Sequence, residues 1–144
     1  MNIFKLIKFI GSKNPNYEFD KIQKHLPLRP IKNEGMLDDN GLLQGMWGDY
    51  YKNGNLQFKG YYKDGKQDGD WEKYYPNGNI ETKGFYKDGK TDGDWEHYWE
   101  NGNLRYKGHY KDGKYNGDWE WYNNDGNLNY KGYFKDGKPI FNKK

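Results

Sequence analysis

The stretch GDWEKYYPNGNIETKGFYKDGKTD, from Gly69 to Asp92, decides the fold of this chain. Within it, Asn77-Gly78 separates two runs rich in Tyr, Trp and Ile. An Asn-Gly or Asp-Gly pair between two such runs is a strong hairpin signal, because both residues tolerate positive φ in a type I′ turn. We therefore expect residues 70–75 and 80–87 to be the antiparallel arms of one hairpin. Residues 88–93 (Asp-Gly-Lys-Thr-Asp-Gly) then turn the chain into the next hairpin.

The same pattern recurs at intervals of 24 residues. A tryptophan and a strand glycine keep this interval, at Trp47, Trp71, Trp95 and Trp119 and at Gly60, Gly84, Gly108 and Gly132. A fixed period of this length indicates an array of supersecondary units. The chain has no Cys, but it has 15 Tyr, 7 Phe, 6 Trp and 20 Gly, a composition typical of strands and turns. The sequence thus predicts an all-β, elongated single array of about four antiparallel β-hairpin repeats.

Three segments follow from the limits of this pattern. Residues 35–138 hold the repeat array, beginning with a degenerate unit around Asn40-Gly41. Residues 1–34 match nothing in the repeat and form an N-terminal cap segment, and residues 139–144 form a C-terminal tail. Atypical terminal units are common in repeat arrays.

Positions that recur in every copy are explained by the geometry of the repeat. We expect them to form the core, with each strand glycine leaving room for an opposing ring. Trp71 and Tyr74 conflict with this picture, because strict alternation places residues three apart on opposite faces of a strand; a β-bulge would remove the conflict. The expected core columns are Trp47/Trp71/Trp95/Trp119, Tyr50/Tyr74/Tyr98/Tyr122, Leu56/Ile80/Leu104/Leu128 and Tyr62/Tyr86/Tyr110/Phe134.

Positions that differ between copies are free of this demand and are available for recognition. Tyr and Trp with a neighbouring Arg are the residue types enriched at binding hot spots. The alternative is that these are ordinary half-exposed residues in cross-strand pairs. The partner-binding patch predicted from these columns comprises His97, Trp99, Arg105, Tyr106, His109, Trp121 and Tyr130.

Catalytic and metal-binding groupings are not recognisable in the sequence. The three histidines, His25, His97 and His109, have no Cys and no suitably spaced carboxylates beside them. The Asp-Gly-Lys-x-Asp-Gly segments lack the ligand spacing of a calcium loop, and turn chemistry explains them better. We expect no enzyme activity, no cofactor and no metal site. The array is also nearly neutral, so we expect no nucleic acid as a partner.

The N-terminal segment has a different character. Residues 1–34 carry seven basic and three acidic side chains, within a net charge of +3 for the whole chain. Residues 2–10 are compatible with a short amphipathic helix, which must dock on something to be ordered. It either caps the open end of the first hairpin or lies on a membrane surface or on a partner. Since Lys5 and Lys8 interrupt the apolar run and no small-residue cleavage site follows, we expect no signal peptide, no membrane span and a cytoplasmic location.

The motif G-x-[YF]-K-D-G-K-x-[DN]-G-D-W, present at residues 60–71, 84–95 and 108–119, resembles the MORN repeat. It is most similar to the bacterial variant, in which N-G-x-[IL]-x-x-K-G completes the unit. The resemblance implies a non-enzymatic hairpin array that binds proteins or, in some eukaryotic members, membranes. Proteins built of the bacterial variant are often labelled antitoxins, which implies a toxin as a partner. A weaker resemblance, to choline-binding and glucan-binding repeats of bacterial surfaces, implies an exported protein with units nearer 20 residues.

Overall fold

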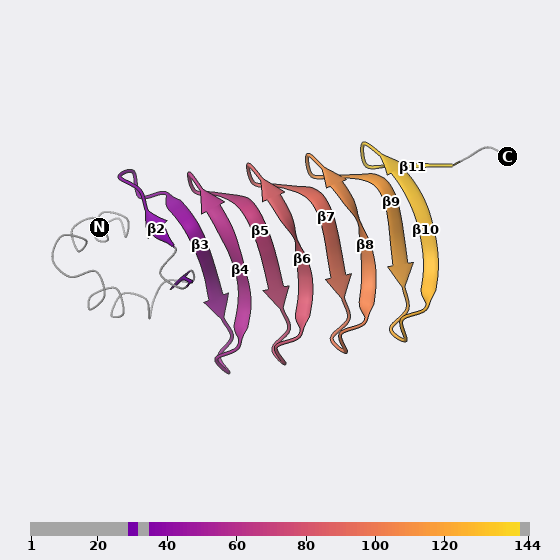
Figure 1. Cartoon of the computed structure of the whole chain (residues 1–144), viewed down its shortest axis with the longest axis horizontal. Helices are drawn as coiled ribbons and strands as arrows, with labels where there is room; N and C mark the ends of the chain where they lie inside the picture. The colour runs from indigo at the N-terminus through magenta and orange to yellow at the C-terminus, as the bar shows by residue number, and fades with distance from the viewer. Residues whose placement is uncertain (1–28, 32–34, 142–144) are drawn as a thin grey trace.

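A computed structural model describes residues 29–31 and 35–141 of the chain, and these residues form an eleven-stranded antiparallel sheet. Figure 1 shows the strands side by side along the long axis of the molecule. The predicted all-β array of hairpins is confirmed. The strands are β1 (Arg29–Pro30), β2 (Met36–Leu37), β3 (Leu43–Tyr50), β4 (Leu56–Lys63), β5 (Lys66–Tyr74), β6 (Ile80–Lys87), β7 (Lys90–Tyr98), β8 (Leu104–Lys111), β9 (Lys114–Tyr122), β10 (Leu128–Lys135) and β11 (Lys138–Ile140).

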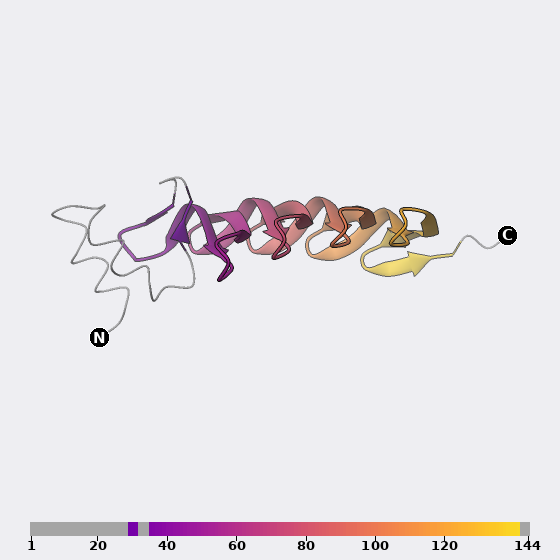
Figure 2. The same ribbon diagram turned by 90° about the horizontal axis from the view of Figure 1, so that it is seen from below.

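The sheet is a single layer. From β3 to β10 each strand pairs with the strand before it and the strand after it in the sequence. Within the described ranges there is no helix and no second sheet that covers either face. Figure 2, turned by 90°, shows the hairpins following one another in a narrow row. Both faces of the sheet are therefore available for contacts.

Two kinds of turn alternate along the sheet, and they differ from the prediction. At Asp64-Gly65 both residues have positive φ, 50° and 77°, as a type I′ turn requires. At Asn53-Gly54 only the glycine does (φ 88°), and the amide of Gly54 donates to the carbonyl of Tyr51 at 2.9 Å. This is the pattern of a type I turn closed by a left-handed glycine. The type I′ assignment was wrong for the Asn-Gly turns and correct for the two-residue Asp-Gly turns.

Consequently, the first arm of each hairpin is longer than predicted. Only Asp88-Gly89 of the segment 88–93 lies in the turn, because β7 already begins at Lys90. In the same way β5 begins at Lys66 rather than at Asp70 and ends at Tyr74, whereas β6 has the predicted bounds. Sequence reasoning treated the polar residues of 66–69 as turn formers, although they are paired in the sheet.

Hydrogen bonds join each repeat to the next at both ends of the strands. At the Asp-Gly end, the amide of Gly89 donates to the carbonyl of Gln67 at 2.8 Å. At the Asn-Gly end, the Asn79 side chain donates to the carbonyl of Glu100 at 2.8 Å, and the Tyr75 hydroxyl donates to the carbonyl of Tyr98 at 2.8 Å. Equivalent bonds recur from Asn55 and from Asn103 to the following repeat. The turns are thus held by their neighbours as well as by their own strands.

The two faces of the sheet have different chemistry. We name the face that carries Trp47, Trp71, Trp95 and Trp119 the aromatic face, and the opposite one the ladder face. Three of these tryptophans are the most buried large side chains of the described residues, with exposures of 2% for Trp47, 4% for Trp95 and 0% for Trp119. A Cβ added at Gly108 would lie 2.1 Å from Cδ2 of Trp119. As expected, the strand glycines Gly60, Gly84 and Gly108 each give room for the following tryptophan ring, whereas Gly132 faces Tyr130 and Phe134.

The predicted core was partly wrong. The tyrosine column lies on the ladder face, since the hydroxyl of Tyr74 donates to the carboxylate of Glu72, its neighbour on the same face. Strict alternation between Trp71 and Tyr74 therefore holds, and the bulges lie elsewhere: Lys73 pairs with Thr82 but Tyr74 pairs with Ile80. In the Leu/Ile column the first three residues are half-buried, and Leu128 is 48% exposed. A single-layer sheet has no second layer to bury these columns.

Short strands extend the sheet at its two ends. β1 pairs with the second half of β3, and β2 pairs with its first half. The amide of the buried Ile31 donates a hydrogen bond to the carbonyl of Met46 at 3.0 Å. Residues 29–31 and 36–37 therefore cover the outer edge of the first hairpin. At the other end, β11 pairs with residues 133–135 of β10. The helix expected at residues 2–10 and the cap or membrane role of residues 1–28 lie outside the described residues.

Candidate functional site

The aromatic face carries a connected network of rings that runs from β4 to β10. Its repeating element is a tyrosine edge against two successive tryptophans: Tyr86 lies 5.5 Å from Trp71 and 5.1 Å from Trp95, both T-shaped. Tyr110 repeats this arrangement with Trp95 at 5.9 Å and Trp119 at 5.0 Å. Edge-to-face pairs contribute about 0.5–1.5 kcal/mol each beyond the area they bury. The network binds the repeats together in the absence of a second layer.

Four of the predicted binding residues form one row across this face. His97 pairs with Tyr106, Tyr106 with Trp121, and Trp121 with Tyr130, on four consecutive strands. The rings of His97 and Tyr106 stack at 4.1 Å, and those of Trp121 and Tyr130 lie 5.2 Å apart. Tyr130 is 50% exposed, at the C-terminal end of the row. Residues that vary between repeats thus become neighbours in space.

His97 is the titratable group of this row. Its Nδ1 lies 2.8 Å from the hydroxyl oxygen of the buried Thr82, and its ring stacks on Trp95 at 6.2 Å. Burial lowers the pKa of His97 from 6.5 to about 4, with smaller contributions from the charges of nearby residues. The imidazole is therefore neutral at pH 7 and contributes a flat ring to the stack.

Trp99 and Arg105 lie together at the Asn-Gly end of the strands. The guanidinium carbon of Arg105 is 4.4 Å from the centre of a Trp99 ring, in a cation–π contact. The Trp99 indole also donates to the carbonyl of Tyr122 at 3.3 Å, where Tyr51 and Tyr75 make the equivalent bond in other repeats. This column therefore has a structural task that sequence reasoning missed. Arg105 occupies the bulge position of its hairpin, since His97 pairs with Tyr106 but Tyr98 pairs with Leu104.

The ladder face carries a row of lysines and glutamates whose opposite charges neutralise one another, and we name this row the charge ladder. Lys83 pairs with Glu96 at 2.7 Å, and Lys107 pairs with Glu120 at 3.2 Å. Glu120 also accepts hydrogen bonds from Lys131 and from the Tyr122 hydroxyl, and these three donors together lower its pKa to about 2. Each ladder carboxylate thus has a lysine and a tyrosine as partners.

A second row on the ladder face consists of aspartate–ring pairs within the hairpins, and between hairpins the rings lie against the bulge glycines Gly69, Gly93 and Gly117. Asp70 pairs with Phe85, Asp94 with His109, and Asp118 with Tyr133. The predicted binding residue His109 therefore lies on the other face of the sheet from His97, Tyr106, Trp121 and Tyr130. Its Nδ1 is 2.9 Å from an Asp94 carboxylate oxygen. The rings of this row are Tyr61, Phe85, His109 and Tyr133, and its carboxylates are Asp70, Asp94 and Asp118. We name it the ring–carboxylate row.

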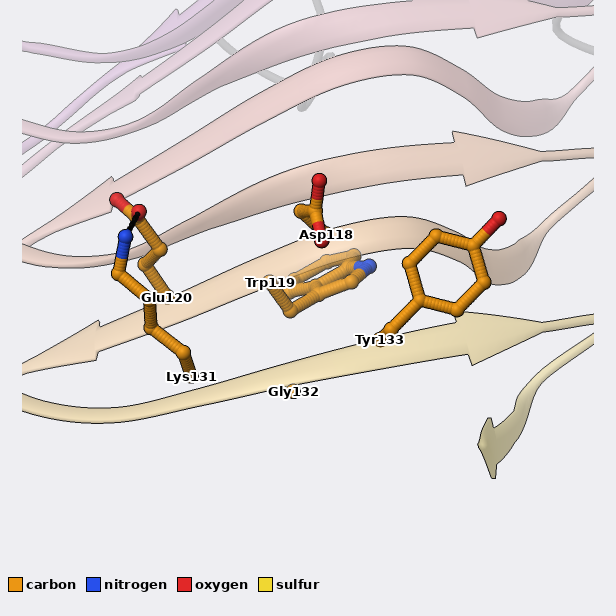
Figure 3. A pocket seen from close by; sticks show the side chains of 6 residues that line it. All are labelled: Asp118, Trp119, Glu120, Lys131, Gly132 and Tyr133. Atoms are coloured by element: carbon orange, nitrogen blue, oxygen red, sulfur yellow. Dashed lines mark ion pairs between the residues drawn. The ribbon is translucent and has the colours of Figure 1, made fainter. Parts of the chain in front are cut away.

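A shallow open hollow of about 330 Å³ lies between the two rows near the C-terminal end. It is lined by Asp118 and Tyr133 of the ring–carboxylate row, by Glu120 and Lys131 of the charge ladder, and by Trp119 and Gly132. Figure 3 shows Asp118 and Tyr133 next to one another and apart from the Glu120–Lys131 ion pair. The hollow is a groove of the surface rather than an enclosed pocket.

The repeats of this geometry match a known family model, the MORN repeat variant. Four matches, at residues 43–64, 67–88, 91–112 and 115–136, cover more than half of the chain. The chain belongs to this family. MORN repeats are non-catalytic repeats that generally mediate protein or membrane interactions. No curated protein is similar enough in sequence to be matched to the chain.

Within residues 29–31 and 35–141 no group of three or more His, Asp or Glu could hold a metal ion. The same residues include no helix that is long and apolar enough to cross a membrane. The surfaces that this MORN protein offers to a ligand include the two faces of its sheet. Of these, sequence reasoning singled out one row of the aromatic face and did not recognise the ladder face as a surface.

Proposed function

We propose that this MORN protein is a non-enzymatic scaffold that binds a protein partner through the aromatic face of its C-terminal repeats. The observation that carries the proposal is the row of neighbouring variable residues His97, Tyr106, Trp121 and Tyr130. Large rigid side chains lose little conformational entropy on binding and are enriched at hot spots. The row also ends in an exposed ring, that of Tyr130.

A matched pair of variants tests this proposal on one strand. Tyr130 and Tyr133 both lie in β10 and have exposures of 50% and 51%, but they lie on opposite faces. Affinity capture from the native cytoplasm with the full chain as bait identifies the partner, and the same capture is repeated with Tyr130→Ala and Tyr133→Ala. We expect Tyr130→Ala to weaken capture about tenfold, as loss of a hot-spot aromatic does, and Tyr133→Ala to leave it unchanged. Equal capture by both variants and the unmodified chain would contradict the proposal.

A toxin neutralised in the cytoplasm is the finer form of this proposal. Its support is the antitoxin label often given to proteins built of the bacterial variant repeat. The test is whether coexpression of the captured partner alone arrests growth and whether coexpression with this chain restores it. A partner that is harmless alone would remove the antitoxin role and leave the scaffold role in place.

Membrane attachment through the N-terminal segment is the second candidate. Its support is the basic excess of residues 1–34, because the rest of the chain is nearly neutral. Each lysine near an anionic surface contributes about 1 kcal/mol before screening, so attachment would be weak and salt-sensitive. Deletion of residues 1–12 should then abolish co-sedimentation with anionic liposomes without changing the melting temperature. If the segment is a cap instead, the same deletion should lower the melting temperature.

A further inference from the structure

The ring–carboxylate row is exposed along its length. Tyr61 is 36% exposed, Phe85 38% and Tyr133 51%. The carboxylates of the row are exposed too, and the Asp94 side chain retains 92% of its surface. The neighbouring charge ladder differs, because its lysines and glutamates are paired with each other. The row thus offers rings and negative charges to a ligand, while the ladder beside it is already neutralised.

The spacing of the row selects the shape of a ligand. Neighbouring strands lie about 4.8 Å apart, so rings two strands apart recur at about 9.6 Å. A polyproline II helix has three residues per turn and a rise of about 3.1 Å, which gives a repeat of about 9.3 Å. Over the three intervals between four rings the mismatch grows to only about 1 Å. A peptide in this conformation, laid across the strands, presents the same side of every third residue to each repeat.

Other regular peptide conformations fit the row less well. In an extended strand, residues on one side recur at about 6.7 Å and 13.3 Å, and neither distance matches 9.6 Å. Seven residues of an α-helix, which make nearly two turns, advance by about 10.5 Å, so the mismatch over three intervals reaches about 2.7 Å. The polyproline II conformation is also formed before binding, which lowers the entropic cost of the complex.

The chemistry of the row selects the side chains of the ligand. Aromatic grooves accept the flat face of proline, as in other polyproline II recognition sites. Carboxylates beside rings favour arginine, whose planar guanidinium pairs with carboxylates and stacks on aromatic faces. Asp70 and Asp118 make no ion pair with another described residue that would have to be broken first. The hollow beside Asp118 and Tyr133 gives space for such a side chain.

We propose that the ring–carboxylate row of the ladder face binds a polyproline II segment of a protein in which proline and arginine recur every third residue. This site lies on the face opposite to the aromatic row of the proposed scaffold function, so either can fail alone. Phe85 and Tyr133 hold the prolines, and Asp70 and Asp118 hold the arginines. Asp94, already in contact with His109, contributes less.

The test uses the full chain and a labelled peptide of four Pro-Ala-Arg triplets, with fluorescence anisotropy as the readout. A peptide of the same composition in scrambled order is the control for charge alone. We expect the triplet peptide to bind at least tenfold more tightly than the scrambled one at physiological salt. Equal binding of the two peptides would overturn the proposal, because non-specific attraction does not depend on the order of residues.

Two pairs of matched variants locate the site. Asp70→Asn/Asp118→Asn should weaken binding of the triplet peptide about fivefold, because two exposed ion pairs are lost. Asp39→Asn/Glu100→Gln removes the same charge from exposed sites outside the row and should change it less than twofold. Tyr133→Ala should weaken it about tenfold and Tyr130→Ala should not, the reverse of the expectation for the aromatic-face partner. Equal effects within either pair would overturn the proposal, and circular dichroism verifies that each variant is folded.

Discussion

The two faces of this sheet are built from the same strands but contribute to different properties. On the aromatic face, Trp95 and Trp119 are 4% and 0% exposed and contact rings from the adjacent strands. On the ladder face, Phe85 and Tyr133, which occupy the same position in their repeats, keep 38% and 51% of their surface exposed. The aromatic face therefore holds the most buried rings and the ladder face presents exposed ones, so we expect the loss of a ring to lower stability more on the aromatic face. The comparison indicates that a single-layer sheet can build its core within one of its own surfaces.

The largest expected effect separates the two faces directly. Trp119→Ala removes a fully buried ring that contacts Tyr106, Tyr110, Tyr115 and Trp121, and it should lower the free energy of unfolding by about 3–5 kcal/mol. Tyr133→Ala, on the ladder face, should lower it by less than about 0.5 kcal/mol. Urea unfolding followed by tryptophan fluorescence measures both. Losses of similar size would mean that the ladder face also forms part of the core.

A smaller effect is expected from added volume on the aromatic face. In Gly108→Ala the new Cβ would lie 2.1 Å from Trp119, and such overpacking costs about 1–3 kcal/mol. Gly132→Ala has the same chemical change in the same column, but its nearest neighbour is the Tyr130 hydroxyl at 3.0 Å, the end of an exposed side chain. Gly132→Ala should therefore cost less than about 1 kcal/mol. Thermal unfolding of the two variants measures both losses. A larger loss of stability in Gly132→Ala than in Gly108→Ala would contradict the close packing of Trp119 against Gly108.

The smallest effect concerns pH. The pKa of His97 is about 4 in the folded chain and 6.5 without burial, so the unfolded chain binds an extra proton between these values. The stability linked to the neutral His97 is therefore fully present above about pH 6.5 and is lost as the pH falls from 6.5 to 4. Because the ring is only partly buried, we expect a loss of about 1 kcal/mol rather than the full value of the shift.

The control for this pH effect is on the other face. His97→Gln should flatten the pH dependence of the unfolding free energy between pH 6.5 and 4, whereas His109→Gln should retain it. Urea titrations at both pH values measure the difference. An unchanged slope in His97→Gln would show that the buried imidazole is not the source.

Much of this architecture was predictable from the sequence because the repeat itself is so regular. The period of Trp47, Trp71, Trp95 and Trp119 predicted the hairpins, and the strand glycines predicted the space for the rings. The side of the tyrosine column was not predicted correctly, although the separation of three residues between Trp71 and Tyr74 held the answer. The prediction instead assumed that all large rings are buried together. That assumption holds for a sheet covered by a second layer, but not for this single-layer sheet.

The candidate site was predictable only in part. Comparing the repeats within the chain found His97, Tyr106, Trp121 and Tyr130, which are neighbours on consecutive strands. It also selected Trp99, whose indole bonds to the next repeat, and His109, which lies on the opposite face. Variation between copies does not indicate the face of a strand: Tyr106 and His109 both vary, but they lie three residues apart in regular pairing and therefore on opposite faces. Of the ring–carboxylate row only His109 was selected, because comparing the repeats favours positions that vary, and its aspartates are identical in three of the four repeats.

The hydrogen bonds between neighbouring repeats have a consequence for how the chain reaches its fold. The side-chain bonds that join one repeat to the next reach at most 23 residues along the sequence, as from Tyr75 to Tyr98. Folding therefore needs no long loop to close, and low contact order of this kind favours fast folding despite the all-β architecture. Stability becomes a sum over units and their interfaces, so unfolding should start by fraying at the ends while the central hairpins persist. A gene for such an array can gain or lose a segment encoding 24 residues without disturbing the contacts of the remaining units.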